Sequence, residues 1–206
     1  AWGLTFFLLA ALFICFSLYH FFILPKPISD ESKKMVSPAE MLRDFGHTFI
    51  TFFQKKDVAL MFFFILTYRL GEAQLSKIAS PFLLDTLENG GLNMSTSTYG
   101  LIYGTFGVAA LLLGGIIGGV LISRHGLKRW IIPMALLINL PDIFYVFLAY
   151  YQPSVSMAAI FVVLEQFGYG FGFTAYMLYL INIADGEYKT AHYAIATGFM
   201  ALGMML

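Results

Sequence analysis

The chain has 206 residues, of which 59% are hydrophobic and 12% are charged. Soluble domains average about 45–50% apolar and about 25% charged residues, so this composition excludes a soluble cytosolic enzyme. Twelve basic and twelve acidic residues give no net charge, which offers no support for a nucleic-acid partner. The single cysteine and four scattered histidines have no metal-ligand spacing, so we expect neither a metal nor another cofactor.

The first apolar run, residues 1–24, contains no Asp, Glu, Lys or Arg and ends at Pro25-Lys26-Pro27. Since about 20 apolar residues cross a bilayer as one helix, the run predicts a transmembrane helix. A cleaved signal peptide is the alternative, but the basic N-terminal region and the cleavage pattern of such a peptide are missing. Because the sequence begins and stops inside apolar stretches, we expect it to be a piece of a longer protein.

Five further apolar runs follow, at residues 57–84, 98–122, 130–151, 157–183 and 191–206. With the first run they predict five complete crossings and one partial crossing. In lipid each crossing must satisfy its own backbone hydrogen bonds, so the crossings are expected to be helices. The predicted fold class is an all-α polytopic membrane protein with about six transmembrane helices.

Orientation follows from the cations, because positive residues concentrate in cytoplasmic connections. The connections 25–56, 123–129 and 184–190 hold ten of the twelve Lys and Arg residues, and the alternate connections 85–97 and 152–156 hold none. The sequence therefore predicts that 25–56 is cytoplasmic.

This long connection contains a helix signal of its own. Ser37, Pro38 and Glu40 match the N-cap, the first helical position and the capping-box acid. Apolar residues then recur at helical spacing, namely Met41, Leu42, Phe45, Phe49, Phe52 and Phe53. The pattern predicts an amphipathic helix on the inner membrane face, which is either a tether between two helix bundles or a site for a regulatory partner.

Polar residues inside the spans are the candidate functional residues, because a charge at the bilayer centre costs about 2.5–3.5 kcal/mol. In the second run Arg69, Glu72, Ser76 and Ser80 share one face of an ideal helix. We place Arg69, Glu72 and Ser76 on a substrate or proton pathway. The alternative is that Arg69 and Glu72 pair at i, i+3 and only neutralise each other.

The fifth run carries a second polar face. It consists of Glu165, Tyr169, Gly172, Tyr176 and Tyr179. A carboxyl and three phenols on one face suit a wet, aromatic-lined cavity, so the acid and the tyrosines join the candidate pathway. The alternative is that the phenols pack against neighbouring helices and that Glu165 is the salt partner of Arg69.

Two other spans have signals of a different kind. In the fourth run Asn139 and Asp142 flank Pro141, which predicts a kink and adds both polar residues to the pathway. In the third run glycines recur at four-residue spacing, which favours close packing of helix backbones. These pairs are Gly100/Gly104, Gly114/Gly118 and Gly115/Gly119.

Two helix bundles joined by a long cytoplasmic amphipathic linker resemble the major facilitator superfamily. The stretch from Gly119 to Arg129 is similar to its cytoplasmic motif G-x-L-x-D-R-x-G-R-R, with Ser123 where the pattern has aspartate. The resemblance implies a gating turn formed by Gly119, Arg124, Gly126, Lys128 and Arg129. It also implies three parts: 1–24 as the last helix of an N-terminal bundle, 25–56 as the linker, and 57–206 as an incomplete C-terminal bundle.

Within that superfamily, Tyr68-Arg69-Leu70-Gly71-Glu72 and Pro81-Phe82-Leu83-Leu84-Asp85 resemble the AmpG-type muropeptide permeases. The resemblance implies proton-coupled import of an anhydro-muropeptide across a bacterial inner membrane by alternating access. The implied partners are this small-molecule substrate, protons, the lipid bilayer and a missing N-terminal bundle of the same protein. Carriers of acetyl-CoA-like solutes or sugars remain alternatives, followed by a channel or a membrane-embedded enzyme, for which the sequence offers no facing nucleophile or metal ligands.

Overall fold

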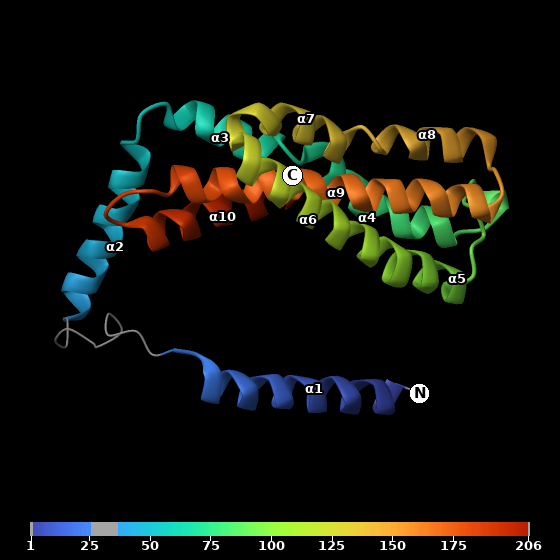
Figure 1. Cartoon of the computed structure of the whole chain (residues 1–206), viewed down its shortest axis with the longest axis horizontal. Helices are drawn as coiled ribbons and strands as arrows, with labels where there is room; N and C mark the ends of the chain where they lie inside the picture. The colour runs from blue at the N-terminus through green and yellow to red at the C-terminus, as the bar shows by residue number, and fades with distance from the viewer. Residues whose placement is uncertain (1, 26–36, 206) are drawn as a thin grey trace. The chain divides into compact units, whose positions relative to one another are not determined.

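The structure is a computed structural model that describes residues 2–25 and 37–205 (Figure 1). All regular secondary structure in these residues is helical. Five helical stretches are long and apolar enough to span a membrane: Trp2–Ile23, Val58–Leu84, Thr96–His125, Leu127–Tyr151 and Val155–Ile183. A further helix, α10 (Lys189–Met205), corresponds to the partial crossing. The prediction of an all-α polytopic membrane protein is confirmed.

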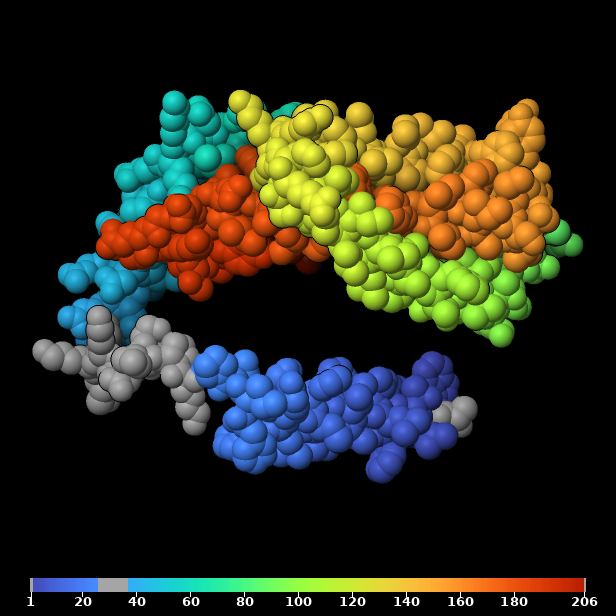
Figure 2. Space-filling model, in the orientation of Figure 1, coloured from blue at the N-terminus to red at the C-terminus, as the bar shows by residue number. Residues whose placement is uncertain are grey.

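The described chain divides into two compact units, Ala1–Asp44 and Phe45–Leu206. The first unit contains α1 (Trp2–Ile23), drawn in blue in Figure 2, in which no residue is buried and most large apolar side chains are exposed. An apolar helix that exposes every side is suited to lipid or to neighbouring helices. The linker predicted at 25–56 includes residues 26–36, among them Lys26, Lys33 and Lys34, which lie outside the described residues.

The predicted capping box is present at the start of α2 (Pro38–Phe53). The Ser37 N–H donates to Glu40 Oε2 at 2.9 Å, and the Glu40 N–H donates to Ser37 Oγ at 3.2 Å. These bonds from the Ser37 backbone and side chain lower the pKa of the Glu40 carboxyl, because they favour its ionised form. The helix therefore begins where the sequence predicts.

The C-terminal part of α2 packs within the second unit. The rings of Phe53 and Phe62 stack at 5.3 Å, and Thr51 Oγ1 lies 3.1 Å from Nε2 of His192 on α10. Beyond the helix end, Lys55 Nζ donates to the carbonyl of Asp185 at 2.7 Å. Phe52 is buried by this packing, whereas Phe45 and Phe53 of the same apolar face remain exposed.

Three predicted spans are interrupted rather than continuous. The second consists of α3 (Val58–Thr67) and α4 (Leu70–Leu84), and the fourth of α7 (Leu127–Asn139) and α8 (Asp142–Tyr151). The third consists of α5 (Thr96–Leu101), a π-helical turn labelled η3 (Ile102–Gly107) and α6 (Val108–His125). The break before α8 falls at Pro141, as predicted, whereas the breaks in the second and third spans have no proline signal.

The fifth span is one uninterrupted helix, α9 (Val155–Ile183), and it packs most extensively against α6 and α7. Glycines make this close packing possible. A Cβ at Gly170 would collide with the carbonyl of Leu111 on α6, and a Cβ at Gly168 would collide with the carbonyl of Leu137 on α7. These contacts place α9 at the centre of the second unit (Figure 1).

The predicted glycine pairs of the third span do not behave alike. Gly114 and Gly118 are buried, and a Cβ at Gly114 would collide with the carbonyl of Phe167 on α9. A Cβ at Gly100 or Gly104 would meet no atom of the described residues within 4 Å. Close backbone approach is therefore confirmed for Gly114/Gly118, and for Gly100/Gly104 the described part of the chain has no such contact.

The connection between α4 and α5 is a compact loop containing the short helix η2 (Leu87–Asn89). It folds back on the end of α4, where Leu92 N donates to Phe82 O at 3.0 Å and Met94 N donates to Leu83 O at 2.9 Å. Asp85 Oδ1 accepts bonds from Thr86 N at 2.8 Å and from Asn89 Nδ2 at 3.0 Å. The loop is fixed by these local bonds.

Candidate functional site

The break in the second span is the centre of the candidate site. In a continuous helix Ile65 O would accept from the N–H of residue 69, but here it accepts from the Tyr176 hydroxyl at 2.7 Å. The carbonyl of Tyr68 accepts from Asn139 Nδ2 at 2.9 Å. Side chains from α9 and α7 therefore satisfy the backbone groups that the break releases, which is the condition for non-helical backbone at membrane depth.

The two tyrosines at this break are also locked against each other. The Tyr68 hydroxyl donates to the carbonyl of Gly172 at 2.9 Å, and the rings of Tyr68 and Tyr176 stack at 4.9 Å with an interplanar angle of 7°. Each tyrosine thus bonds to the backbone of the other's helix. The sequence predicts Tyr176 as a pathway residue. In the structure its hydroxyl donates to a carbonyl of the broken span.

Arg69 follows the break directly and forms a buried ion pair with Glu72. Its Nη2 lies 2.7 Å and its Nε 3.1 Å from Glu72 Oε2, with side-chain exposures of 6% for Arg69 and 9% for Glu72. Arg69 Nη2 also donates to the Tyr169 hydroxyl at 3.1 Å. The guanidinium carbon lies 5.0 Å from the Tyr169 ring centre and 4.8 Å from that of Phe173, which favours the cation further.

Glu165 is buried on α9 but has a different set of partners. Its Oε2 accepts from the hydroxyls of Tyr103 at 3.1 Å and Tyr145 at 3.2 Å, and its Oε1 accepts from Gln166 Nε2 at 2.9 Å. The alternative in which Glu165 pairs with Arg69 is therefore wrong, because Arg69 pairs with Glu72. All three hydrogen-bond donors to Glu165 are neutral groups.

Asp142 supplies a third carboxyl, at the first residue of α8. Its Oδ1 is buried and has no hydrogen-bond partner within the described residues. A Cβ at Gly71 would lie only 2.6 Å from Asp142 Oδ2 and 2.9 Å from Asn139 Oδ1. The glycine after the break therefore lets the start of α4 approach these two polar side chains closely.

The three carboxyls belong to one electrostatic cluster. Glu72 interacts electrostatically with both Asp142 and Glu165. Arg69 is the cation that pairs with a member of this cluster. If all three acids are ionised, the cluster carries two more negative than positive charges.

The remaining predicted pathway residues, Ser76 and Tyr179, take no part in the hydrogen bonds described above. Ser76 is exposed and donates to the carbonyl of Ala73 on its own helix at 3.0 Å, and Tyr179 packs its ring 4.3 Å from that of Phe64. Three partners of Glu165 were missed from the sequence, namely Tyr103, Tyr145 and Gln166. Tyr145 had a weak signal as a polar residue at i+3 from Asp142, but nothing in the sequence placed Tyr103 beside the fifth span.

The predicted gating turn joins α6 to α7. Gly126 has φ +81°, a left-handed conformation that favours glycine, so the motif's central glycine has a physical role. Ser123 Oγ donates to the carbonyl of Val120 at 2.8 Å. Gly119 lies one turn earlier, and the cations Arg124, Lys128 and Arg129 are exposed and form no ion pair within the part of the chain that the structure describes.

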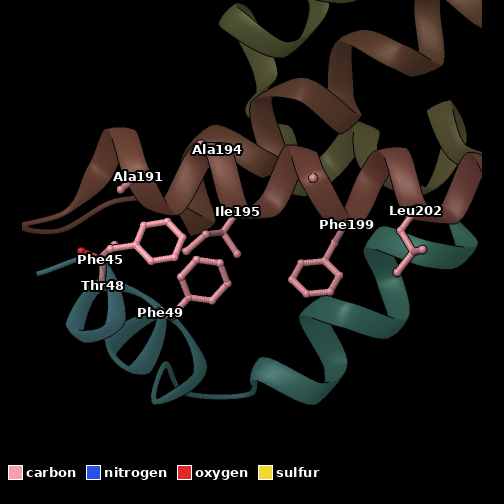
Figure 3. A pocket seen from close by; sticks show the side chains of 9 residues that line it. Phe45, Thr48, Phe49, Ala191, Ala194, Ile195, Phe199 and Leu202 are labelled. Carbon is pink, nitrogen blue, oxygen red and sulfur yellow. The ribbon is translucent and has the colours of Figure 1, made fainter. Parts of the chain in front are cut away.

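Two grooves adjoin these elements. One, of about 400 Å³, lies between α4 and α8 and is lined in part by Gly71, Gln74, Asp142 and Tyr145, so it borders the acidic cluster. The other, of about 450 Å³, lies along α10 beside α2 and is lined by apolar residues except for Thr48 (Figure 3). Among the described residues, no group of three or more His, Cys, Asp or Glu side chains is placed to hold a metal ion.

A helical integral membrane protein with a buried charge cluster is the class that the fold and site define. No protein-family model matches the sequence. The chain is 24% identical over 201 residues to the putative transporter AmpG 4 of Rickettsia conorii, covering 98% of this chain and 47% of that protein. It is 23% identical over 152 residues to the anhydromuropeptide permease of Escherichia coli K12, covering 74% of this chain and 30% of that protein.

The chain is thus similar to AmpG-type transporters over nearly its whole length, which confirms the resemblance predicted from the sequence. A further relative, the putative transporter AmpG 3 of Rickettsia typhi, is 22% identical over 153 residues, with 74% of this chain and 35% of that protein covered. These relatives are named as transporters or as a permease and not as enzymes, in agreement with the prediction. The chain spans about half the length, or less, of the curated relatives that it matches.

Proposed function

We propose that this protein is part of a proton-coupled carrier of the major facilitator type, which imports an anhydro-muropeptide or a similar amphiphilic sugar–peptide. The carrier would lie in the bacterial inner membrane, with residues 25–56 on the cytoplasmic side. The names of the relatives and the positive connections support this assignment. Since the chain spans about half of its relatives, a second bundle would complete the cavity and allow alternating access.

The observation that carries the proposal is the environment of Glu165. Among the described residues this buried carboxyl is hydrogen-bonded by two phenols and one amide and by no cation, whereas Glu72 has Arg69 as a counter-ion. A buried acid without a cation binds a proton more readily than one held in an ion pair. We therefore assign proton binding to Glu165 and not to Glu72.

Protonation would also change the packing of three spans. As a carboxylate, Glu165 accepts bonds from Tyr103 on the π-helical turn and from Tyr145 on α8. When one carboxyl oxygen carries a proton it becomes a donor as well as an acceptor, so a neighbouring phenol can turn to accept from it. Because π-helical turns commonly occur at functional sites, η3 is a suitable element to move in response.

The aromatic residues beside the cluster suit the proposed solute. Tyr169 and Phe173 lie next to Arg69, and their ring faces could pack on a sugar while hydroxyls bond to its polar groups. The groove between α4 and α8 borders the same cluster and brings Gln74 and Tyr145 to its wall.

The test is uptake of labelled anhydro-muropeptide by cells that express this chain together with the second bundle, with Glu165→Gln as the variant. We expect the wild type to accumulate solute in a way that a protonophore abolishes. The variant should lose this accumulation at least tenfold, yet retain exchange of external for internal solute, because exchange requires no net proton transfer. Glu88→Gln, in the exposed helix η2, is the matched control and should behave as wild type.

Proton-driven accumulation that is undiminished in Glu165→Gln would remove this residue from the proton pathway. Accumulation of a sugar or an acyl-CoA, with no uptake of muropeptide, would reassign the solute. Non-saturating flux would instead indicate a channel.

A further inference from the structure

Arg69 has more hydrogen-bond donors than the described residues satisfy. Of its five N–H groups, Nε–H and one on Nη2 go to Glu72, and the other on Nη2 goes to Tyr169. The two on Nη1 have no oxygen acceptor among the described residues, and the neighbour of Nη1 is Met204 Sδ at 3.7 Å. A thioether at this distance is a weak acceptor for a buried guanidinium.

The Tyr169 hydroxyl, next to the guanidinium, also has a proton without an acceptor among the described residues. It accepts from Arg69 Nη2 at 3.1 Å. No acceptor for its own proton lies within hydrogen-bond distance among residues 2–25 and 37–205. Two Nη1 protons and one phenolic proton therefore have no oxygen acceptor in the part of the chain that the structure describes.

Glu72 does not contact the Nη1 group of Arg69. The contacts from Nε and Nη2 both end on one carboxylate oxygen, Oε2, so the pair occupies the Nε side of the guanidinium. The rings of Tyr169 and Phe173 also lie close to the guanidinium, with their centres 5.0 and 4.8 Å from its carbon. The Nη1 side is closed by a methionine side chain, which is flexible and can leave at little cost.

We infer that Arg69 and Tyr169 form a binding site for an oxyanion of the transported solute, a carboxylate or a phosphate, which enters by displacing the side chain of Met204. Guanidinium donors match the oxygens of such groups, and the phenol adds a third bond. The inference deepens the proposed function and rests on it for the identity of the solute.

Charged and phenolic groups surround this site. Arg69 faces Glu72 on its own helix and Tyr169 and Tyr176 on α9, while α10 contributes the uncharged Met204. Glu72 in turn interacts electrostatically with Asp142 on α8 and with Glu165 on α9. An oxyanion bound to Arg69 would therefore add a negative charge to a region that already holds three carboxyls.

The experiment is calorimetric titration of the full chain in lipid nanodiscs. The probes are an anhydro-muropeptide with free carboxylates, the same compound with its carboxylates methyl-esterified, and acetate and inorganic phosphate alone. The variant is Tyr169→Phe, which keeps the ring beside Arg69 and removes the hydroxyl. The matched control is Tyr193→Phe, a partly buried tyrosine of α10 whose hydroxyl has no hydrogen-bond partner in the described chain.

We expect the free acid to bind wild type at least about tenfold more tightly than the ester. Tyr169→Phe should reduce the acid-to-ester ratio to about threefold or less, and Tyr193→Phe should leave it unchanged. A purely structural effect of the variant would weaken acid and ester alike, and that result would overturn the inference.

The remaining outcomes separate the site from the proposed function. Equal binding of acid and ester by wild type would overturn the oxyanion site and leave the carrier proposal standing. Binding of acetate or phosphate that depends on Tyr169, without binding of either muropeptide, would support the site and reject the muropeptide as solute. No binding of any probe to folded protein would overturn the site.

Discussion

Glu72 and Glu165 are both buried near the broken second span, yet their charges are balanced in different ways. Glu72 has a guanidinium 2.7 Å away on the same helix segment. Glu165 has two phenols from other spans and the amide of its sequence neighbour. From the sequence alone the two acids were equivalent candidates for proton binding.

The comparison teaches that burial by itself does not identify a titrating group. A carboxyl with a cationic partner gains stability by staying ionised, and separating the pair leaves an uncompensated charge. A carboxyl held by neutral donors can take a proton and keep part of its hydrogen bonding. In the proposed function Glu72 is therefore assigned a structural or solute-responsive ion pair, and Glu165 is assigned proton exchange.

The largest expected effect comes from removing the cation. Arg69→Met should destabilise the chain by about 3–5 kcal/mol, because Glu72 is left buried without a partner. The double variant Arg69→Met with Glu72→Met should recover much of this loss. Denaturant unfolding in detergent, followed by far-ultraviolet circular dichroism, measures both. A single variant within about 1 kcal/mol of wild type would show that Glu72 does not depend on this pair.

A smaller effect is expected at the phenol-bound acid. Tyr103→Phe removes one donor from Glu165 and should cost about 1–1.5 kcal/mol in the same unfolding assay. Tyr99→Phe is the control for loss of a bonded tyrosine hydroxyl, since the Tyr99 hydroxyl bonds to Ser80 and not to an acid. If Tyr103→Phe is as damaging as Arg69→Met, the distinction between the two glutamates fails.

The smallest effect is expected at an exposed acid, Asp85, just beyond the end of α4. Bonds from the Asn89 side chain and from the Thr86 N–H lower the pKa of its carboxyl below the ordinary 3.8. A lowered pKa gives stability that is present above the ordinary value and is lost as pH falls through the lowered one. The difference in unfolding midpoint between wild type and Asp85→Asn should therefore shrink on acidification below pH 4, and growth of that difference would contradict the assignment.

Part of the site was predictable because its signals are local. A charged residue within an apolar run is visible in the sequence, and so Arg69, Glu72, Asp142 and Glu165 were all candidates. The Arg69–Glu72 pair needs only i, i+3 spacing, and it was foreseen as one reading of these residues. Ser76 and Tyr179 share the same periodicity, but the structure bonds Ser76 to its own helix and packs Tyr179 on Phe64.

The break before Arg69 was not predictable in the same way. The second run has no glycine or proline at Tyr68, and its hydropathy is that of one continuous span. The interruption persists because Tyr176 and Asn139, which are far away in the sequence, satisfy the released carbonyls of Ile65 and Tyr68. Arg69 consequently starts a new helix instead of continuing the old one.

The sequence by itself determined the helical class, the positions of the spans, the capping box of α2 and the likeness to AmpG-type transporters. These properties depend on composition and on residues within about one helical turn of each other. Both are visible in a single sequence. Tertiary structure decided which acid is paired, which phenols reach Glu165 and where the second span breaks. Those outcomes depend on donors brought from distant helices, and their positions are fixed only when α9 packs between α6 and α7.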